Sequence, residues 1–239
     1  MIPELAGLFL GDLAPVGAGL VVNDHTRNFE LVADLTQPGR LSAILERFST
    51  FYQQPEPRAV ASQWSKIYFS KLIVPSVAAS LMLDWRLALD VDETGVILDE
   101  LGRPEAFCLR HAGLAITPRT AEERFSFVID AHIAPVISAI ARVSGLSRKV
   151  LWSNAGNIVE NVLSYCEKSA PAKISVEQAR VLLGARRLSD GEANPLFEPV
   201  RYPELDGAKV RKRRVCCIRY LIPSLAYCKT CPLLKQDMR

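Results

Sequence analysis

The 239-residue sequence contains no Gly-x-Gly-x-x-Gly segment or other nucleotide-binding loop, no nucleophile motif, and only three histidines, His25, His111 and His132. Glycine-rich loops hold the phosphates of dinucleotide cofactors through backbone N–H groups. We therefore expect that the chain does not bind NAD(P)H or flavin itself. A lone histidine on an apolar helix, such as His132, is more often a core residue than a catalytic base.

Long apolar runs are also missing. The longest uncharged stretch near the middle of the chain, Leu72 to Leu83, has 12 residues and includes Pro75, whereas a membrane-spanning helix needs about 20 apolar residues. The first residues, Met-Ile-Pro-Glu-Leu, show no basic region and no small-residue cleavage site of a secretory signal. The sequence thus predicts a cytoplasmic protein without a membrane span, for which peripheral association with a membrane stays open.

Cysteine is scarce except at the carboxyl end, where four of the six residues lie within 16 positions: Cys216, Cys217, Cys228 and Cys231. In a reducing cytosol, crowded thiols are more often metal ligands or redox groups than disulfides. The other two, Cys108 and Cys166, lie among apolar neighbours and are expected to be buried free thiols.

Apolar spacing and end signals predict helices that follow one another along most of the chain. Thr120-Ala-Glu-Glu123 is a capping box that begins one of them, Gly145 ends it, and Ser147 can cap the next. Pro75 is expected to kink or divide its helix, and Pro135 to kink another. The predicted helices cover residues 40–50, 59–82, 120–145, 147–165 and 175–184.

Between residues 85 and 110 the pattern changes to short alternating segments separated by turn residues, which predicts a small antiparallel sheet. Residues 194–206 contain three prolines and are interpreted as a linker. The predicted fold class is therefore α+β. It consists of a mainly helical body, residues 1–207, with one small antiparallel sheet, followed by a short cysteine-bearing segment, residues 208–239.

The spacing Cys-Cys-x(10)-Cys-x(2)-Cys permits three kinds of site. A structural zinc site prefers two Cys-x(2–4)-Cys pairs, and adjacent cysteines, whose Cα atoms are about 3.8 Å apart, fit one small ion poorly. A two-iron cluster offers ligand positions on two metals and relaxes this demand. Thiol redox chemistry is the third possibility, so the metal stays open on spacing alone.

The same segment resembles the carboxyl-terminal segment of the FhuF-type siderophore-iron reductases. The resemblance rests on the cysteine spacing, on Arg214-Val-Cys-Cys-Ile-Arg-Tyr and on Cys231-Pro-Leu, and more loosely on Trp152-Ser-Asn154. It implies a 2Fe–2S cluster held by Cys216, Cys217, Cys228 and Cys231. It also implies an oxidoreductase that reduces ferric siderophores by one electron in the cytoplasm and releases Fe(II).

Charge is distributed unevenly along the chain. Residues 208–239 hold nine Lys and Arg but one acidic residue, a net charge of +8, against −5 for the preceding 207 residues. Because the basic residues lie on both sides of the cysteines, we expect them to offset the cluster's negative charge and to attract anionic chelates or an acidic donor protein rather than nucleic acid. The residues predicted to contact the substrate are Trp152, Asn154, Arg213, Arg214 and Arg219.

Two partners follow from these inferences: a ferric siderophore, expected to be of hydroxamate type, and an external electron donor such as a ferredoxin or a flavoprotein reductase. Two alternatives stay open from the sequence. The first is a non-enzymatic 2Fe–2S electron carrier or redox sensor. The second is a zinc-stabilised binding protein.

Overall fold

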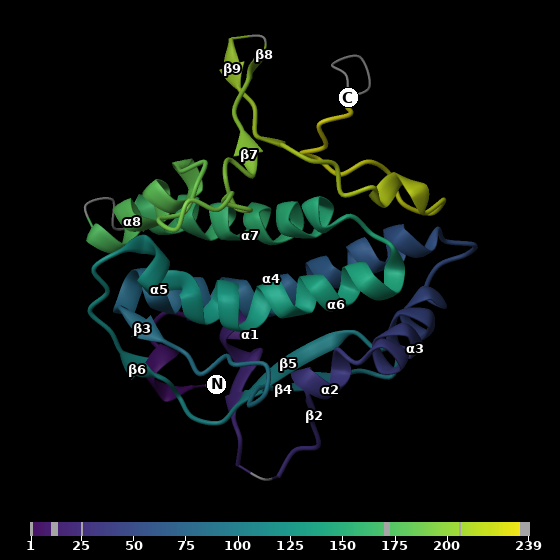
Figure 1. Ribbon diagram of the computed structural model, residues 1–239, viewed down its shortest axis with the longest axis horizontal. Helices are drawn as coiled ribbons and strands as arrows, with labels where there is room; N and C mark the ends of the chain where they lie inside the picture. The colour runs from purple at the N-terminus through teal and green to yellow at the C-terminus, as the bar shows by residue number, and fades with distance from the viewer. Residues whose placement is uncertain (1, 11–13, 25, 170–172, 206, 235–239) are drawn as a thin grey trace.

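The computed structural model describes residues 2–10, 14–24, 26–169, 173–205 and 207–234, and its centre is a pair of long packed helices, α4 (Pro57–Leu83) and α7 (Arg148–Ser169). In Figure 1, α4 and α6 (Ala134–Ser144) form a middle layer, with the main sheet on one side and α7 with the carboxyl-terminal segment on the other. This arrangement places the cysteine-bearing segment at the opposite side of the body from the sheet.

Helix α4 begins and ends as its sequence dictates. The Glu56 carboxylate caps its first turn by accepting a hydrogen bond from the Ala59 N–H at 2.9 Å, and Asp84 ends it in the left-handed conformation with φ of 52°. Of the two outcomes predicted for Pro75, a kink or a division of the helix, the division is wrong, because the helix runs unbroken through this residue; the kink stays a prediction. Packing on both sides of a mostly buried helix outweighs the cost of one missing backbone hydrogen bond.

The segment from 121 to 144 contains a local irregularity near Pro135. The capping box is confirmed: Thr120 and Glu123 satisfy each other's backbone N–H groups at the start of α5 (Ala121–Val128). A π-helical turn, Ile129–Ile133, then joins α5 to α6, and the Ala134 N–H bonds to the Ile129 carbonyl. The wider turn accommodates the proline without ending the helix, and Gly145 ends α6 with φ of 66°.

The main sheet is larger than predicted and is mixed. The expected antiparallel pair is present as β4 (Gly95–Leu98) and β5 (Pro104–Leu109), but β1 (Leu20–Val22) adds to β5 in parallel and β2 (Glu30–Leu31) adds to β4. Strands of two or three residues are too short to show a period-two pattern. A separate antiparallel pair is formed by β3 (Trp85–Arg86) and β6 (Leu114–Ala115).

Shorter elements complete the body and leave the α+β class as predicted. They are η1 (Pro3–Leu5), α1 (Ala14–Ala18), α2 (Val32–Leu35), α3 (Pro38–Ser49) and α8 (Ile174–Gly184). Two helical segments, Pro57–Leu83 and Ala121–Ser144, are long and apolar enough to cross a membrane by length and composition. Core helices meet the same criteria, and both segments pack inside the body, with 56% and 44% of their apolar windows buried.

The predicted linker takes part in holding the carboxyl-terminal segment. Its strand β7 (Val200–Arg201) pairs antiparallel with β10 (Lys212–Arg213), so that Val200 lies opposite Arg213. Between them, β8 (Glu204–Leu205) and β9 (Ala208–Lys209) form a hairpin that projects from the body in Figure 1. The division of the chain at residues 207 and 208 stays a prediction, although the two parts are joined by this strand pair.

His132 lies in the core, as expected from the sequence. It is fully buried, its Nδ1 donates to the Leu89 carbonyl at 2.7 Å, and its Nε2 accepts from the Tyr68 hydroxyl at 2.6 Å. Burial lowers the pKa of His132 from 6.5 to about 4. Between pH 6.5 and about 4, the ring therefore stays neutral in the folded protein, whereas in the unfolded chain it takes up a proton.

We predict that this histidine makes the fold acid-sensitive. Stability present above pH 6.5 should be lost as the pH falls towards 4, by roughly 3 kcal/mol in all. Urea unfolding at several pH values measures the effect, and His132→Leu should flatten the slope in that window although it lowers stability overall. His111→Gln, at an exposed position, is the control. An unchanged slope in His132→Leu would contradict the prediction.

Candidate metal centre

The four clustered cysteines bring their sulfur atoms together in two pairs. Cys216 Sγ lies 3.8 Å from Cys231 Sγ, and Cys217 Sγ lies 4.0 Å from Cys228 Sγ. Two thiolates bound at about 2.3 Å to one tetrahedral metal lie about 3.8 Å apart, so each pair fits one metal ion. Among the described residues, no group of three or more Cys, His, Asp or Glu side chains is placed to hold a single ion. The donor set therefore fits a two-metal cluster better than one zinc.

The adjacent cysteines Cys216 and Cys217 belong to different pairs. They therefore do not have to bind one small ion together, which adjacent cysteines do poorly. The backbone turns sharply after Cys217, where Ile218 adopts the left-handed conformation with φ of 50° and its N–H donates to Cys216 Sγ at 3.3 Å. A β-branched residue in this region costs of order 1–3 kcal/mol. The Ile218 side chain packs against the hydrophobic core, which holds the turn in place.

The sulfurs differ in burial and in charge environment. Cys217 and Cys231 are buried, and Cys216 and Cys228 are half-buried. The hydrogen bond with Cys228 lowers the pKa of Cys217 to about 5, and the cations of Lys66 and Arg213 act in the same direction. Lys66 Nζ lies 3.9 Å from Cys217 Sγ. Because metals bind thiolates rather than thiols, these cations favour the metal-binding form of Cys217, whereas burial raises the pKa of Cys216.

A buried polar network fixes the cysteine-bearing segment to the seam between α4 and α7. The Ser62 hydroxyl donates to the Cys217 carbonyl at 2.7 Å, and Asn154 Nδ2 donates to the hydroxyl oxygens of Ser62 and Ser65 at 3.1 and 3.0 Å. On its other side, Asn154 Oδ1 accepts from the Arg213 guanidinium. The network thus connects both core helices to the turn at residues 216–218, which we call the metal-binding turn.

Two of the predicted substrate residues are part of this network. Asn154 is 1% exposed and Arg213 is 3% exposed, and their side chains bond to each other inside the protein. They position the cysteines, and a contact of either residue with the substrate stays a prediction. The sequence did not identify Ser62, Ser65 or Lys66, because α4 has the pattern of an ordinary apolar core helix.

A second anchor lies further along α7. Arg211 pairs with the Glu160 carboxylate, and the Tyr202 hydroxyl donates to the same carboxylate. Lys212 Nζ donates to the Cys231 carbonyl at 3.2 Å. In the basic run before the cysteines, Arg211 is therefore engaged with the body, and Lys212 with the turn that contains Cys228 and Cys231.

The remaining predicted substrate residues lie in separate places. Trp152 and Arg214 line one cavity, of about 470 Å³, together with Phe197. Arg219 begins the short helix η4 (Arg219–Leu221), which packs against α4. The structure thus brings Trp152 and Arg214 together at one cavity and Asn154 and Arg213 together inside the protein. The role of these residues in substrate binding stays a prediction.

The α+β body and the paired thiolates define an iron–sulfur protein whose cluster segment is attached to a helical core. Residues 62–210 match the family described as "Ferric iron reductase FhuF-like transporter", and residues 213–233, which include all four cysteines, match the "FhuF 2Fe-2S C-terminal domain". Since the first match alone covers more than half of the chain, the protein belongs to the FhuF-like ferric iron reductase family. It is an oxidoreductase with a 2Fe–2S cluster, as the resemblance implied.

A curated relative agrees with this assignment, and solved structures of another protein share the fold. The chain is 27% identical over 214 residues to the ferric siderophore reductase of Escherichia coli (strain K12), covering 86% of this chain and 80% of that protein. Two structures of aerobactin synthetase from Klebsiella pneumoniae share the fold, with TM-scores of 0.59 and 0.54 at 14% and 15% identity. The likeness covers 81% and 71% of this chain but 47% and 37% of the synthetase chains.

We predict that Asn154→Ala loosens the cysteine-bearing segment. The substitution removes the nearest side-chain acceptor of the buried Arg213 guanidinium and leaves only the longer contact with the Ser153 hydroxyl, at 3.4 Å, which should cost about 3 kcal/mol. Thermal unfolding should show a lower midpoint, and trypsin should cut the basic segment faster. Asn157→Ala, which removes a partner of Arg211 at a less buried position, is the control. Equal trypsin resistance in wild type and Asn154→Ala would contradict the role of the network.

Proposed function

We propose that this protein reduces the iron(III) of a siderophore chelate by one electron in the cytoplasm, so that iron is released as Fe(II). We also propose that Cys216, Cys217, Cys228 and Cys231 are the four ligands of the 2Fe–2S cluster. The observation that carries this proposal is the pairing of four sulfurs, at 3.8 and 4.0 Å, within the segment that matches the family's 2Fe–2S domain. The name of the relative from Escherichia coli supports the substrate class.

The substrate chemistry needs one electron and no proton-transfer group. Hydroxamate oxygens are hard donors that suit iron(III), and the larger and less charged iron(II) ion binds them poorly. A 2Fe–2S cluster, when bound, supplies single electrons. Reduction therefore releases the metal while every covalent bond of the siderophore stays intact, which agrees with the absence of a nucleophile motif in the sequence.

The residues of the chain hold the site near the surface and balance its charge. Cys216 and Cys228 are half-buried, which leaves one side of the centre close to a docked chelate. Lys66 and Arg213 provide positive charge beside Cys217, and Asn154 keeps Arg213 in place. This geometry supports electron transfer by contact between the centre and a bound chelate.

Electrons must come from another protein, since the chain has no nucleotide-binding loop. We propose a ferredoxin or a flavoprotein reductase as the donor, attracted by the basic residues on both sides of the cysteines. A simple electron carrier or redox sensor would share the cluster. It would differ in failing to reduce ferric chelates.

Single-turnover reduction tests the function. Protein purified without oxygen should contain about two iron and two acid-labile sulfide per chain, as a 2Fe–2S cluster requires, and after chemical reduction it should convert a ferric hydroxamate to Fe(II) captured by a colorimetric chelator. Cys217→Ser should lose the visible absorption and the turnover, whereas Cys108→Ser, at a buried thiol outside the site, should keep both. A reduced wild-type protein that leaves ferric hydroxamates unchanged would refute the proposal.

We predict that Lys66 raises the reduction potential. Its ammonium lies 3.9 Å from Cys217 Sγ and stabilises the more negative, reduced state of the centre. Lys66→Met should therefore lower the potential by on the order of 50 mV, about a tenfold change in a one-electron equilibrium. Redox titration followed by visible absorption measures the shift. Lys71→Met, on the same helix, is the control, and equal shifts in both variants would contradict a specific effect.

A further inference from the structure

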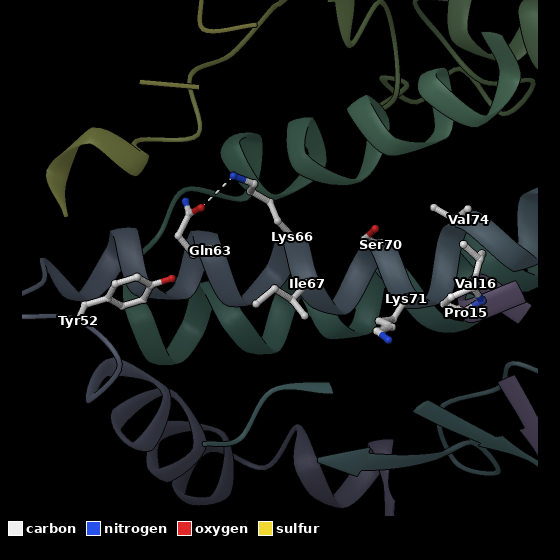
Figure 2. Close-up of a pocket in the computed structure, with 9 residues that line it drawn as sticks. All are labelled: Pro15, Val16, Tyr52, Gln63, Lys66, Ile67, Ser70, Lys71 and Val74. Atoms are coloured by element: carbon white, nitrogen blue, oxygen red, sulfur yellow. Dashed lines mark hydrogen bonds between the residues drawn. The ribbon is translucent and has the colours of Figure 1, made fainter. Parts of the chain in front are cut away.

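A groove runs along the outer face of α4 next to the cysteine site. It has a volume of about 470 Å³ and is lined by α4, by two residues of α1 and by Tyr52 (Figure 2). This volume is within the range of small-molecule sites. The lining residues are Pro15, Val16, Tyr52, Gln63, Lys66, Ile67, Ser70, Lys71 and Val74.

The polar groups of the groove are mainly hydrogen-bond donors and cations. Gln63 is 7% exposed, and its Oε1 accepts from Lys66 Nζ at 2.9 Å, whereas its buried Nε2 has no hydrogen-bond partner among the described residues. A buried amide without a partner destabilises the protein, and an acceptor oxygen on a ligand would offset that cost. Both charged side chains of the lining, Lys66 and Lys71, are basic.

The groove and the cysteines share one residue. Lys66 lines the groove and also lies 3.9 Å from Cys217 Sγ. The helix η4, which follows the adjacent cysteines, packs against α4, and Arg219 Nε in it is a second buried donor without a partner among the described residues. A ligand at the end of the groove formed by Gln63 and Lys66 would therefore lie beside the metal-binding turn.

The cavity at Trp152 is less suited to the same ligand. Two of its cations are already engaged: Arg186 and Arg214 both stack on the ring of Phe197, at 5.1 and 4.9 Å, and Arg214 also donates to the Phe197 carbonyl at 2.9 Å. These contacts use the guanidinium faces to pack the segment before the cysteines. In the α4 groove, by contrast, the buried Gln63 Nε2 has no hydrogen-bond partner among the described residues, although Lys66 bonds to the Oε1 of the same side chain.

We propose that the α4 groove binds the ferric siderophore and favours hydroxamate chelates of net negative charge, such as those built on a carboxylate-bearing backbone. Ile67, Val16 and Val74 contact the apolar part of the chelate, while Gln63 and the two lysines face its oxygen atoms. The Lys66 ammonium lies between two negatively charged groups, the chelate and the thiolates. This inference rests on the proposed function, whose substrate class it uses.

Gallium(III) chelates separate binding from reduction, because gallium(III) has the charge and size of iron(III) but accepts no electron from the protein. Calorimetry with the cluster-loaded protein should show tighter binding of a gallium citrate-hydroxamate than of a neutral gallium trihydroxamate. Gln63→Met should raise the dissociation constant of the anionic chelate about tenfold or more, since it removes a donor to a charged acceptor. Ser70→Trp should raise it similarly by filling the groove.

Two further variants test position and charge. Ser138→Trp makes the same substitution at an exposed serine of α6 and should bind as wild type does. Lys71→Glu should weaken the anionic chelate about tenfold and leave the neutral one unaffected. The visible absorption and iron content of each variant show whether the cluster segment is intact.

The outcomes distinguish this inference from the proposed function on which it rests. Wild-type affinity in both Gln63→Met and Ser70→Trp, or a loss of binding confined to Trp152→Ala, would overturn the groove assignment while reduction by the wild type could still stand. Equal affinity for the neutral and anionic chelates would overturn the charge preference. A wild type that binds the gallium chelate in the groove but fails to reduce the ferric chelate would refute the proposed function and leave the binding site.

Discussion

The structure depends on one buried polar contact, the hydrogen bond between Asn154 of α7 and the guanidinium of Arg213. A cation removed from water must be compensated inside the protein, and burial lowers the pKa of Arg213 accordingly. The Asn154 amide provides one part of the compensation, and the negative charge of the nearby thiolates provides another. Because the same amide also bonds to two serines of α4, the metal-binding turn has one position relative to both core helices.

That position decides how four cysteines close together in sequence divide into two sulfur pairs. Each pair takes one sulfur from the Cys216-Cys217 step and one from the Cys228-Lys-Thr-Cys231 turn. The left-handed backbone at Ile218 allows adjacent cysteines to serve different pairs. The conformational cost of that turn is offset by the packing of the Ile218 side chain on the core.

The fold alone does not determine the chemistry. Aerobactin synthetase shares the α+β fold with this chain at 14% identity, and one fold supports different reactions when different sites are built on it. What assigns this protein to ferric reduction is the match of residues 62–210 to the ferric iron reductase family, together with the segment matched to its 2Fe–2S domain. The groove along α4 shows how a helix of the shared core can also serve that segment, because Lys66 belongs to both.

The sequence by itself determined the features that depend on neighbours along the chain: the longer helices of the body, the capping box at Thr120, antiparallel strands within residues 85–110, and the cluster of four cysteines. Only the tertiary structure decided which sulfurs pair, that Asn154 and Arg213 lie inside, and that a lysine of α4 lies beside Cys217. The physical reason is sequence distance. Helix and turn signals act over a few residues, whereas the bond from Ser62 to the Cys217 carbonyl joins residues 155 positions apart, and its existence depends on how α4 and α7 pack.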